Sequence, residues 1–133
     1  MNKKEVGNYC EQICSNYLIN LGYNIIETNY YSRYGEIDII AKNNEYLIFV
    51  EAKARILNSV IKAYEAVNKK KMEKIIKTAY VFLSCNEYKL QPRFDICEIY
   101  FLKNKIDNNI KIEKINYIKN SFDLNCLNLD TRL

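Results

Sequence analysis

A chain of 133 residues has room for one domain of ordinary size, which we expect to span residues 1–133. Its composition, 49% hydrophobic and 27% charged with three glycines and one proline, is typical of a folded globular protein and excludes a disordered one. There is no histidine, which excludes serine–histidine, cysteine–histidine and histidine-ligated zinc chemistry and leaves carboxylates, lysine, tyrosine and thiolates.

The net charge of +4 is carried by the second half of the chain, where residues 67–133 hold thirteen lysines and arginines against eight acids. Many of these lysines lie close together between residues 69 and 77, and such a basic stretch can attract a polyanion such as nucleic acid. Taken alone, the same run is explained more simply as the solvated face of a helix.

The N-terminus lacks the apolar segment of a secretory signal, and no run approaches the roughly 18 apolar residues of a membrane span. We therefore expect a cytoplasmic protein without a membrane partner. The five cysteines include no Cys-x-x-Cys pair, which argues against a disulfide framework and a zinc site. We expect all of them to be small, buried hydrophobic residues: Cys10, Cys14, Cys85, Cys97 and Cys126.

Apolar residues recur at spacings of three and four between Val6 and Leu21, which predicts an amphipathic helix ending at Gly22. Glu11 lies at the border of its apolar face, from which a carboxylate can reach inward. Residues 23–31 are rich in side chains that favour β-structure and are predicted to form a strand.

Residues 36–41 and 45–53 form the clearest pair of strands. They are joined at Asn43 and Asn44, two residues that tolerate the left-handed backbone of a tight hairpin turn. The second of these strands is apolar on both faces over residues 46–50, which predicts a central strand covered by helices on each side.

Residues 54–65 have weak periodicity and are predicted to be a loop or a short helical turn. An apolar stripe over residues 67–83 predicts a second helix with the lysines on its opposite face. Two further strands are expected, over 94–102 and from 110 onward, before a tail from about 121 that lacks a clear period. The predicted order is αβββαββ, which indicates a compact α/β fold with a sheet flanked by helices.

Acids and one lysine cluster on the predicted hairpin. Because residues two apart in a strand share a face, Glu36 and Asp38 point one way while the two isoleucines beside Asp38 point the other. Glu51 and Lys53 share a face by the same rule. Two registers are open, because a two-residue turn makes Asp38 and Glu51 diagonal neighbours whereas a four-residue loop places them directly opposite. Both registers leave all four polar residues on one face.

Clustered carboxylates repel, and a divalent cation held by Asp38 and Glu51 would remove that repulsion and lower the pKa of a bound water. Carboxylates without imidazole are ligands that Mg²⁺ and Mn²⁺ prefer. Lys53 could then orient or help deprotonate the attacking water or stabilise transition-state charge, and Glu11 or Glu36 could complete the metal shell or hold a second ion. The alternative is an ordinary cross-strand ion-pair network, which in an exposed position contributes only about 0.2–1 kcal/mol.

Short motifs follow one another along most of the chain: Gly7 with Glu11, Gly22-Tyr23, Tyr34-Gly35-Glu36-Ile37-Asp38, Phe49-Val50-Glu51-Ala52-Lys53 with Arg55, Ala66-Val67 with Lys71, Arg93-Phe94-Asp95, and Ile118-Lys119-Asn120 with Phe122. In order and spacing they resemble the YraN-like family of small predicted endonucleases. That family is placed in the PD-(D/E)XK nuclease superfamily, which includes the archaeal Holliday-junction resolvases.

The resemblance implies a restriction-endonuclease-like core, in which helices flank a central mixed sheet. By resemblance, Asp38, Glu51 and Lys53 take the places of the acidic pair and the lysine of the superfamily's active site, and Glu11 takes that of a helix-borne acid. The implied metal ligands are Asp38, Glu51 and Glu11, and the implied cofactor is Mg²⁺ or Mn²⁺.

The activity implied by the resemblance is hydrolysis of phosphodiester bonds in DNA, with branched or junction DNA as a candidate substrate and a homodimer as a candidate assembly. The implied candidates for phosphate contact are Arg55, Lys70, Lys71 and Lys74. Two alternatives are open: a non-catalytic nucleic-acid-binding protein on the same fold, and a structural interaction module. Outside this set, we expect Asp95 to have a structural role, capping its strand or pairing with Arg93.

Overall fold

The computed structural model describes residues 2–57 and 69–122. In these residues the chain forms two helices and five strands in the predicted order αβββαββ. Their bounds are α1 (Lys3–Asn20), β1 (Asn24–Ser32), β2 (Gly35–Lys42), β3 (Tyr46–Ile56), α2 (Lys69–Cys85), β4 (Gln91–Lys103) and β5 (Ile110–Phe122). Neither described helix has the length and hydropathy that a membrane span requires.

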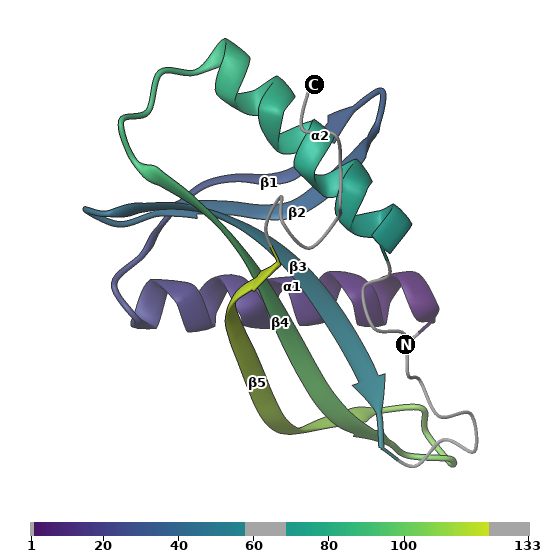
Figure 1. The fold of residues 1–133 in the computed structure, drawn as a ribbon. Coiled ribbons are helices and arrows are strands. Elements are labelled where there is room, and N and C mark those ends of the chain that lie inside the picture. The colour runs from purple at the N-terminus through teal and green to yellow at the C-terminus, as the bar shows by residue number, and fades with distance from the viewer. Residues whose placement is uncertain (1, 58–68, 123–133) are drawn as a thin grey trace.

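The five described strands form one mixed sheet in which sequence order is also spatial order, β1-β2-β3-β4-β5 (Figure 1). β2 runs antiparallel to both β1 and β3, β4 runs parallel to β3, and β5 returns antiparallel to β4. A parallel neighbour requires a crossover connection, and α2 lies in it. The mixed sheet and the central position of β3 confirm the α/β fold predicted from the sequence.

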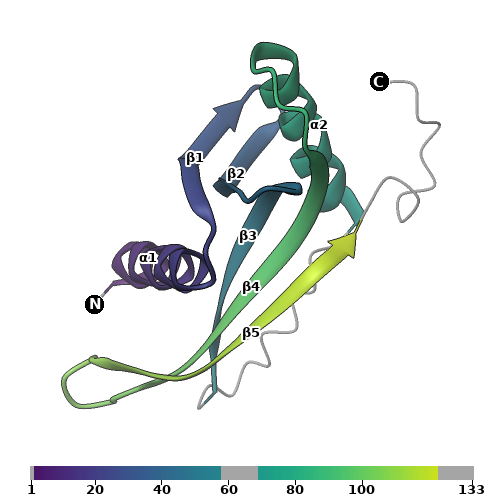
Figure 2. The same cartoon turned by 90° about the vertical axis from the view of Figure 1, so that its left-hand side faces the viewer.

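The two helices cover opposite faces of the sheet, as Figure 2 shows from the side. The α1-side core includes Val6, Cys10, Cys14, Leu18, Ile39, Ala41, Ile48, Val50, Cys97, Ile99 and Phe101. The α2-side core includes Ile37, Ile40, Leu47, Phe49, Ile75, Ile76, Ala79, Phe82 and Phe94. Successive residues of β3 enter the two cores alternately, which explains why this strand is apolar on both faces.

The bounds of α1 follow from capping residues at each end. The side-chain oxygen of Asn2 accepts a hydrogen bond of 2.9 Å from a backbone N–H of the first turn. At the other end Gly22 takes a φ of 94°, a conformation open to glycine at little cost. The N–H groups of Gly22 and Tyr23 then donate back to the carbonyls of Ile19 and Leu18, each at 3.0 Å. The helix therefore ends where the sequence predicted.

The hairpin between β2 and β3 has the four-residue loop, one of the two registers left open. Its first pair is Lys42 with Leu47. The side chain of Asn43 shapes the loop, because its oxygen accepts hydrogen bonds from the N–H groups of Glu45 at 2.9 Å and Tyr46 at 2.7 Å. Neither asparagine of the loop takes the left-handed backbone that a tight two-residue turn would have used.

Three strands extend well beyond their predicted bounds, and β4 runs from Gln91 to Lys103 where residues 94–102 were predicted. β3 continues to Ile56, because it pairs with β4 along its whole length from Tyr46 with Gln91 to Ile56 with Phe101. The predicted loop is therefore wrong for residues 54–56, and residues 58–65 lie outside the described part of the chain. β5 extends to Phe122, beyond the residue at which a less regular tail was expected to begin.

Three of the four described cysteines are buried, as expected. Cys10 and Cys14 on α1 face Cys97 on β4, and the sulfur atoms of Cys14 and Cys97 lie 2.6 Å apart. Cys85 ends α2 and is exposed, so the expectation is wrong there. Cys126 lies outside the described residues.

Candidate active site at the fork of two strands

The predicted carboxylates lie where β2 and β3 separate. The two strands pair from Lys42 with Leu47 to Ile39 with Val50 and then diverge, and Figure 1 shows the fork that results. The residues immediately beyond the last pair are Asp38 and Glu51. The observed register therefore places them across from one another at the base of the fork, while β3 continues beside β4.

The side chain of Asp38 hydrogen-bonds to β3, although the backbones of β2 and β3 have already separated at this point. Its Oδ2 accepts a hydrogen bond of 2.8 Å from the backbone N–H of Ala52 on β3, which replaces a ladder hydrogen bond at the fork. Burial raises the pKa of Asp38 to about 8, with the charge of Glu51 adding to the effect and the Ala52 N–H opposing it. A charged Asp38 is therefore costly here unless a cation is supplied.

The protein places a cation of its own on the second carboxylate. Glu51 is only 6% exposed, and its Oε1 lies 2.7 Å from Nζ of Lys71 in the first turn of α2. Burial disfavours the Lys71 ammonium, but the hydrogen bond and charge of Glu51 outweigh it, so that the pKa of Lys71 lies above its usual value. Lys71 was predicted to contact phosphate, and here it neutralises a site carboxylate.

A second pair of acids lies beside the first. Asn29 on β1 reaches Glu11 of α1 and Glu36 of β2, with its amide nitrogen 3.0 Å from Oε1 of Glu11 and 2.8 Å from Oε1 of Glu36. The nitrogen must face the two acids, because the amide oxygen would repel both. Burial raises the pKa of Glu11, and the charges of Glu36 and Glu51 add to this.

The strand alternation expected at this point fails. Ile39 lies in the α1-side core, whereas Ile37, two residues earlier on β2, lies in the α2-side core. The prediction that both isoleucines share a face is therefore wrong. The change of face falls at Asp38, in the register across from Asn29, whose φ of 52° departs from extended geometry. This change of face accompanies the divergence of β2 from β3.

The remaining predicted site residues are Lys53 and three candidates for phosphate contact, some of which contact other side chains while others are exposed. Lys53 follows Glu51 by two residues on β3, and its side chain neighbours that of Lys71. Arg55, a predicted phosphate contact, binds Glu98 on β4, with Nη2 and Nε at 3.0 and 3.1 Å from Oε2. Predicted phosphate contacts that are exposed on α2 are Lys70 and Lys74.

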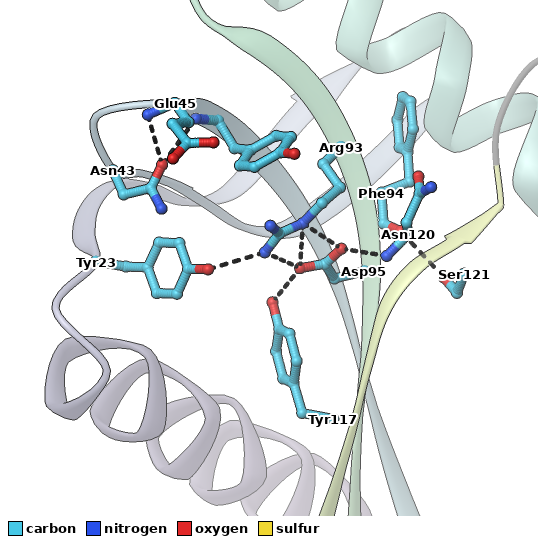
Figure 3. A network of polar contacts seen from close by, with 10 residues as sticks. Tyr23, Asn43, Glu45, Arg93, Phe94, Asp95, Tyr117, Asn120 and Ser121 are labelled. Atoms are coloured by element: carbon cyan, nitrogen blue, oxygen red, sulfur yellow. Dashed lines mark hydrogen bonds and ion pairs between the residues drawn. The ribbon is translucent and has the colours of Figure 1, made fainter.

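A separate polar network surrounds Asp95, which is fully buried (Figure 3). Arg93 donates to both of its carboxylate oxygens at 2.8 to 3.1 Å and also reaches the hydroxyl of Tyr23. The hydroxyl of Tyr117 and the N–H of Asn120 donate to Asp95 at 2.7 and 2.8 Å. The predicted pairing of Asp95 with Arg93 is confirmed.

The donor set at the fork suits a hard divalent cation in type, because Asp38 and Glu51 offer carboxylate oxygens in a partly buried place. Among the described residues, however, no three acidic or cysteine side chains form a ready-made metal cluster. Glu11, the third predicted ligand, is held by Asn29 instead of joining the other two. The carboxylate pair thus fits Mg²⁺ or Mn²⁺, with further ligands to be supplied by water or substrate.

The roles of Asn29 and Lys71 in the site were not predicted from the sequence. Asn29 had no predicted role, and Lys71 was assigned to phosphate. Neither position follows from strand periodicity, because one depends on a left-handed backbone and the other on a contact between two residues that lie twenty positions apart in the chain. The only signal in the sequence was that Lys71 belongs to one of the motifs that carry the family resemblance.

The fold and the fork define an α/β protein with paired carboxylates between diverging strands, consistent with a restriction-endonuclease-like core. The chain belongs to the uncharacterised protein family UPF0102, whose model matches residues 10–99. It is 41% identical to the UPF0102 protein TTE1452 of Caldanaerobacter subterraneus subsp. tengcongensis, over 92% of this chain and 98% of the relative. It is 40% identical to a UPF0102 protein of Clostridioides difficile, over 92% of this chain and 100% of that relative.

Proposed function

We propose that this protein is a metal-dependent endonuclease that hydrolyses phosphodiester bonds in DNA, with Asp38 and Glu51 as ligands of Mg²⁺ or Mn²⁺. The observation that carries the proposal is the pair of carboxylates across the fork. Burial and the charge of Glu51 raise the pKa of Asp38, so the pair is costly without a cation. A purely structural site would be expected to avoid that cost.

The residues of the fork have distinct roles in this proposal. A bound cation would supply Lewis acidity and lower the pKa of water at the site. Asp38 is held in place by the Ala52 N–H, which occupies one of its two carboxylate oxygens. Lys53 can orient the attacking water or stabilise the negative charge that develops on the phosphoryl oxygens. Glu11, close enough to act on the pKa of Asp38, adds negative charge on the α1 side.

The proposed substrate is DNA because exposed lysines lie on the helix that reaches the site. Lys70 and Lys74 flank Lys71 on α2 and are exposed. Contacts of this kind to phosphate are independent of sequence and sensitive to salt. We propose branched DNA as the preferred substrate. A homodimer would place one active site on each strand, so that both strands are cut. The protein would meet this substrate in the cytoplasm.

One observation favours the alternative of a nucleic-acid-binding protein without catalysis. Lys71 already neutralises Glu51 at 2.7 Å, so part of the negative charge at the fork is balanced without a metal ion. In that case the fork would be a structural device that holds the start of α2 against β3, and the exposed lysines of α2 would bind the polyanion.

Cleavage assays decide between the two. A four-way junction and a linear duplex of the same sequence are incubated with Mn²⁺ and wild type, Glu51→Gln or Lys53→Ala. We expect wild-type cleavage, and a loss of about 10²-fold or more in each variant, because Glu51→Gln removes a proposed metal ligand and Lys53→Ala removes a group that orients the water or stabilises the phosphoryl charge.

Glu113→Gln, which removes an exposed carboxylate on β5, serves as the matched control and should cleave as wild type does. Cleavage that survives Glu51→Gln unchanged would contradict the proposed site. Salt-sensitive DNA binding with no cleavage by any form would support the non-catalytic alternative, and absence of both would indicate a structural module.

A further inference from the structure

Asn29 has an unusual backbone for a residue inside a strand. Its φ is 52°, although β1 and β2 remain paired on either side of it, Thr28 with Ile39 and Tyr30 with Ile37. Asn108 and Asn120 are the other described non-glycine residues with positive φ. A left-handed conformation is most readily taken by glycine, asparagine and aspartate. The backbone alone therefore restricts position 29 to a few residue types.

The side chain adds a second restriction. One amide nitrogen donates to Glu11 at 3.0 Å and to Glu36 at 2.8 Å, and thus joins β1 to α1 and β2. Glycine has no donor, and aspartate would place a third carboxylate between two others. Among the three types that tolerate the backbone, only asparagine satisfies both requirements at this position.

The neutrality of the amide is also significant. A lysine or arginine between Glu11 and Glu36 would neutralise them, as Lys71 does for Glu51. An amide holds the two carboxylates in place without bringing a positive charge of its own, and Asp38 lies across from Asn29 in the strand register, so both acids are held beside the fork. The arrangement therefore orders negative charge beside the Asp38–Glu51 pair without cancelling it.

We propose that Asn29 is a positioning residue, which holds Glu11 and Glu36 beside the fork so that a divalent cation binds to a prearranged set of acids. The inference rests on the proposed metal-dependent function and names a residue on which that function depends. In this proposal Glu11 or Glu36 supplies a further ligand when a cation binds beside Asp38 and Glu51, and groups that orient metal ligands through hydrogen bonds typically contribute about 10- to 100-fold to metal affinity.

The test measures Mn²⁺ affinity by titration calorimetry, together with the thermal unfolding midpoint, in wild type, Asn29→Gly and Asn108→Gly. Glycine accepts the positive φ at both positions, so the two variants are matched in backbone, and Asn108 lies in the exposed turn between β4 and β5. We expect Asn29→Gly to weaken Mn²⁺ binding about 10- to 100-fold with an unfolding midpoint close to that of Asn108→Gly. Asn108→Gly should bind as wild type does.

A second measurement separates positioning from a general structural effect. In a Glu11→Gln, Glu36→Gln background, Asn29→Gly should cause little further loss of Mn²⁺ affinity, since the acids that Asn29 holds are already gone. An equal loss in both backgrounds, or equal affinities of Asn29→Gly and wild type, would overturn the positioning role while leaving the proposed function intact. If the wild type binds no Mn²⁺, the proposed function fails and this inference fails with it.

Discussion

Asp38 is subject to two opposing influences. The Ala52 N–H stabilises its charged form through a hydrogen bond of 2.8 Å, whereas burial and the charge of Glu51 favour its protonated form. The second influence is larger, and the pKa rises to about 8. A carboxyl group in this condition binds a proton or a cation near neutral pH, which is the property that the proposed function needs.

The same balance predicts how stability depends on pH in the metal-free protein. The unfolded chain releases the Asp38 proton near pH 3.9, whereas the folded protein retains it to about pH 8. Between these values the folded state binds more protons, so the free energy of unfolding should fall as pH rises, by at most about 1.4 kcal/mol per pH unit. Urea denaturation between about pH 5 and pH 8 measures this slope.

Comparison with Asp38→Asn isolates the contribution of this group, because asparagine does not titrate and the slope should become shallower. Asp107→Asn is the matched control, since Asp107 lies exposed in the turn between β4 and β5. A slope that is the same in wild type and Asp38→Asn would show that the Asp38 proton is not retained in the folded state.

At this scale the sequence predicted part of the site. Strand pairing was enough to bring Asp38 and Glu51 together, because both hairpin registers left open by the sequence make these residues direct or diagonal neighbours. It was not enough for Asn29 or Lys71. The φ of 52° at Asn29 does not alter the alternation of apolar and polar residues from which a strand is predicted. The Lys71–Glu51 ion pair depends on where α2 begins relative to β3.

Among the elements, β4 is held to β5 and to the segment after α1 by a buried network of hydrogen bonds and an ion pair, in addition to apolar packing. Asp95 accepts hydrogen bonds from Arg93 on its own strand and from Tyr117 and Asn120 on β5. Arg93 in turn reaches Tyr23 at the start of the sheet, as Figure 3 shows. All of Asp95 is buried, so the network holds β4, β5 and the segment after α1 in one arrangement.

Removing the charge of Asp95 should therefore be costly. Asp95→Asn leaves the guanidinium of Arg93, 8% exposed, without its counter-ion, and breaking a buried pair in this way typically destabilises a protein by about 3–5 kcal/mol. Urea denaturation at neutral pH measures the loss. Glu113→Gln is the control, because its ion pair with Lys111 is exposed and 3.9 Å long, and its loss should cost less than about 1 kcal/mol. Equal effects of the two substitutions would exclude a stabilising role for the buried network.

The elements themselves were largely predictable, because periodicity depends on residues close in sequence. The end of α1 at Gly22 and the apolar strand β3 are local features of this kind. Two of the errors arise from pairing between strands and not from local sequence. Residues 54–56 form a strand because β4 pairs with them, and Ile37 lies in the α2-side core because β2 changes face at Asp38, across from the left-handed Asn29 of β1.

Across the whole molecule, two groups of exposed lysines can be compared, while other exposed basic residues, such as Lys3, Arg33 and Lys89, lie elsewhere. Lys69, Lys70 and Lys74 are exposed on the first half of α2, near the fork, whereas Lys105 and Lys111 are exposed where β4 turns into β5. Figure 1 shows that this turn lies at the end of the sheet away from α2. If DNA lies across the fork, as proposed, only the first group contacts phosphates.

The salt dependence of DNA binding tests this arrangement directly. Each phosphate contact contributes about 0.9 to the slope of log affinity against log salt, so Lys70→Ala, Lys74→Ala should reduce the slope by about two between roughly 50 and 200 mM salt. Lys105→Ala, Lys111→Ala removes the same net charge from the other end and should leave the slope nearly unchanged, because a distant charge is screened within about 10 Å. Fluorescence anisotropy with a labelled four-way junction gives both slopes. Equal slopes for the two double variants would mean that binding depends on net charge alone, and the DNA would then have no fixed position over the Asp38–Glu51 pair.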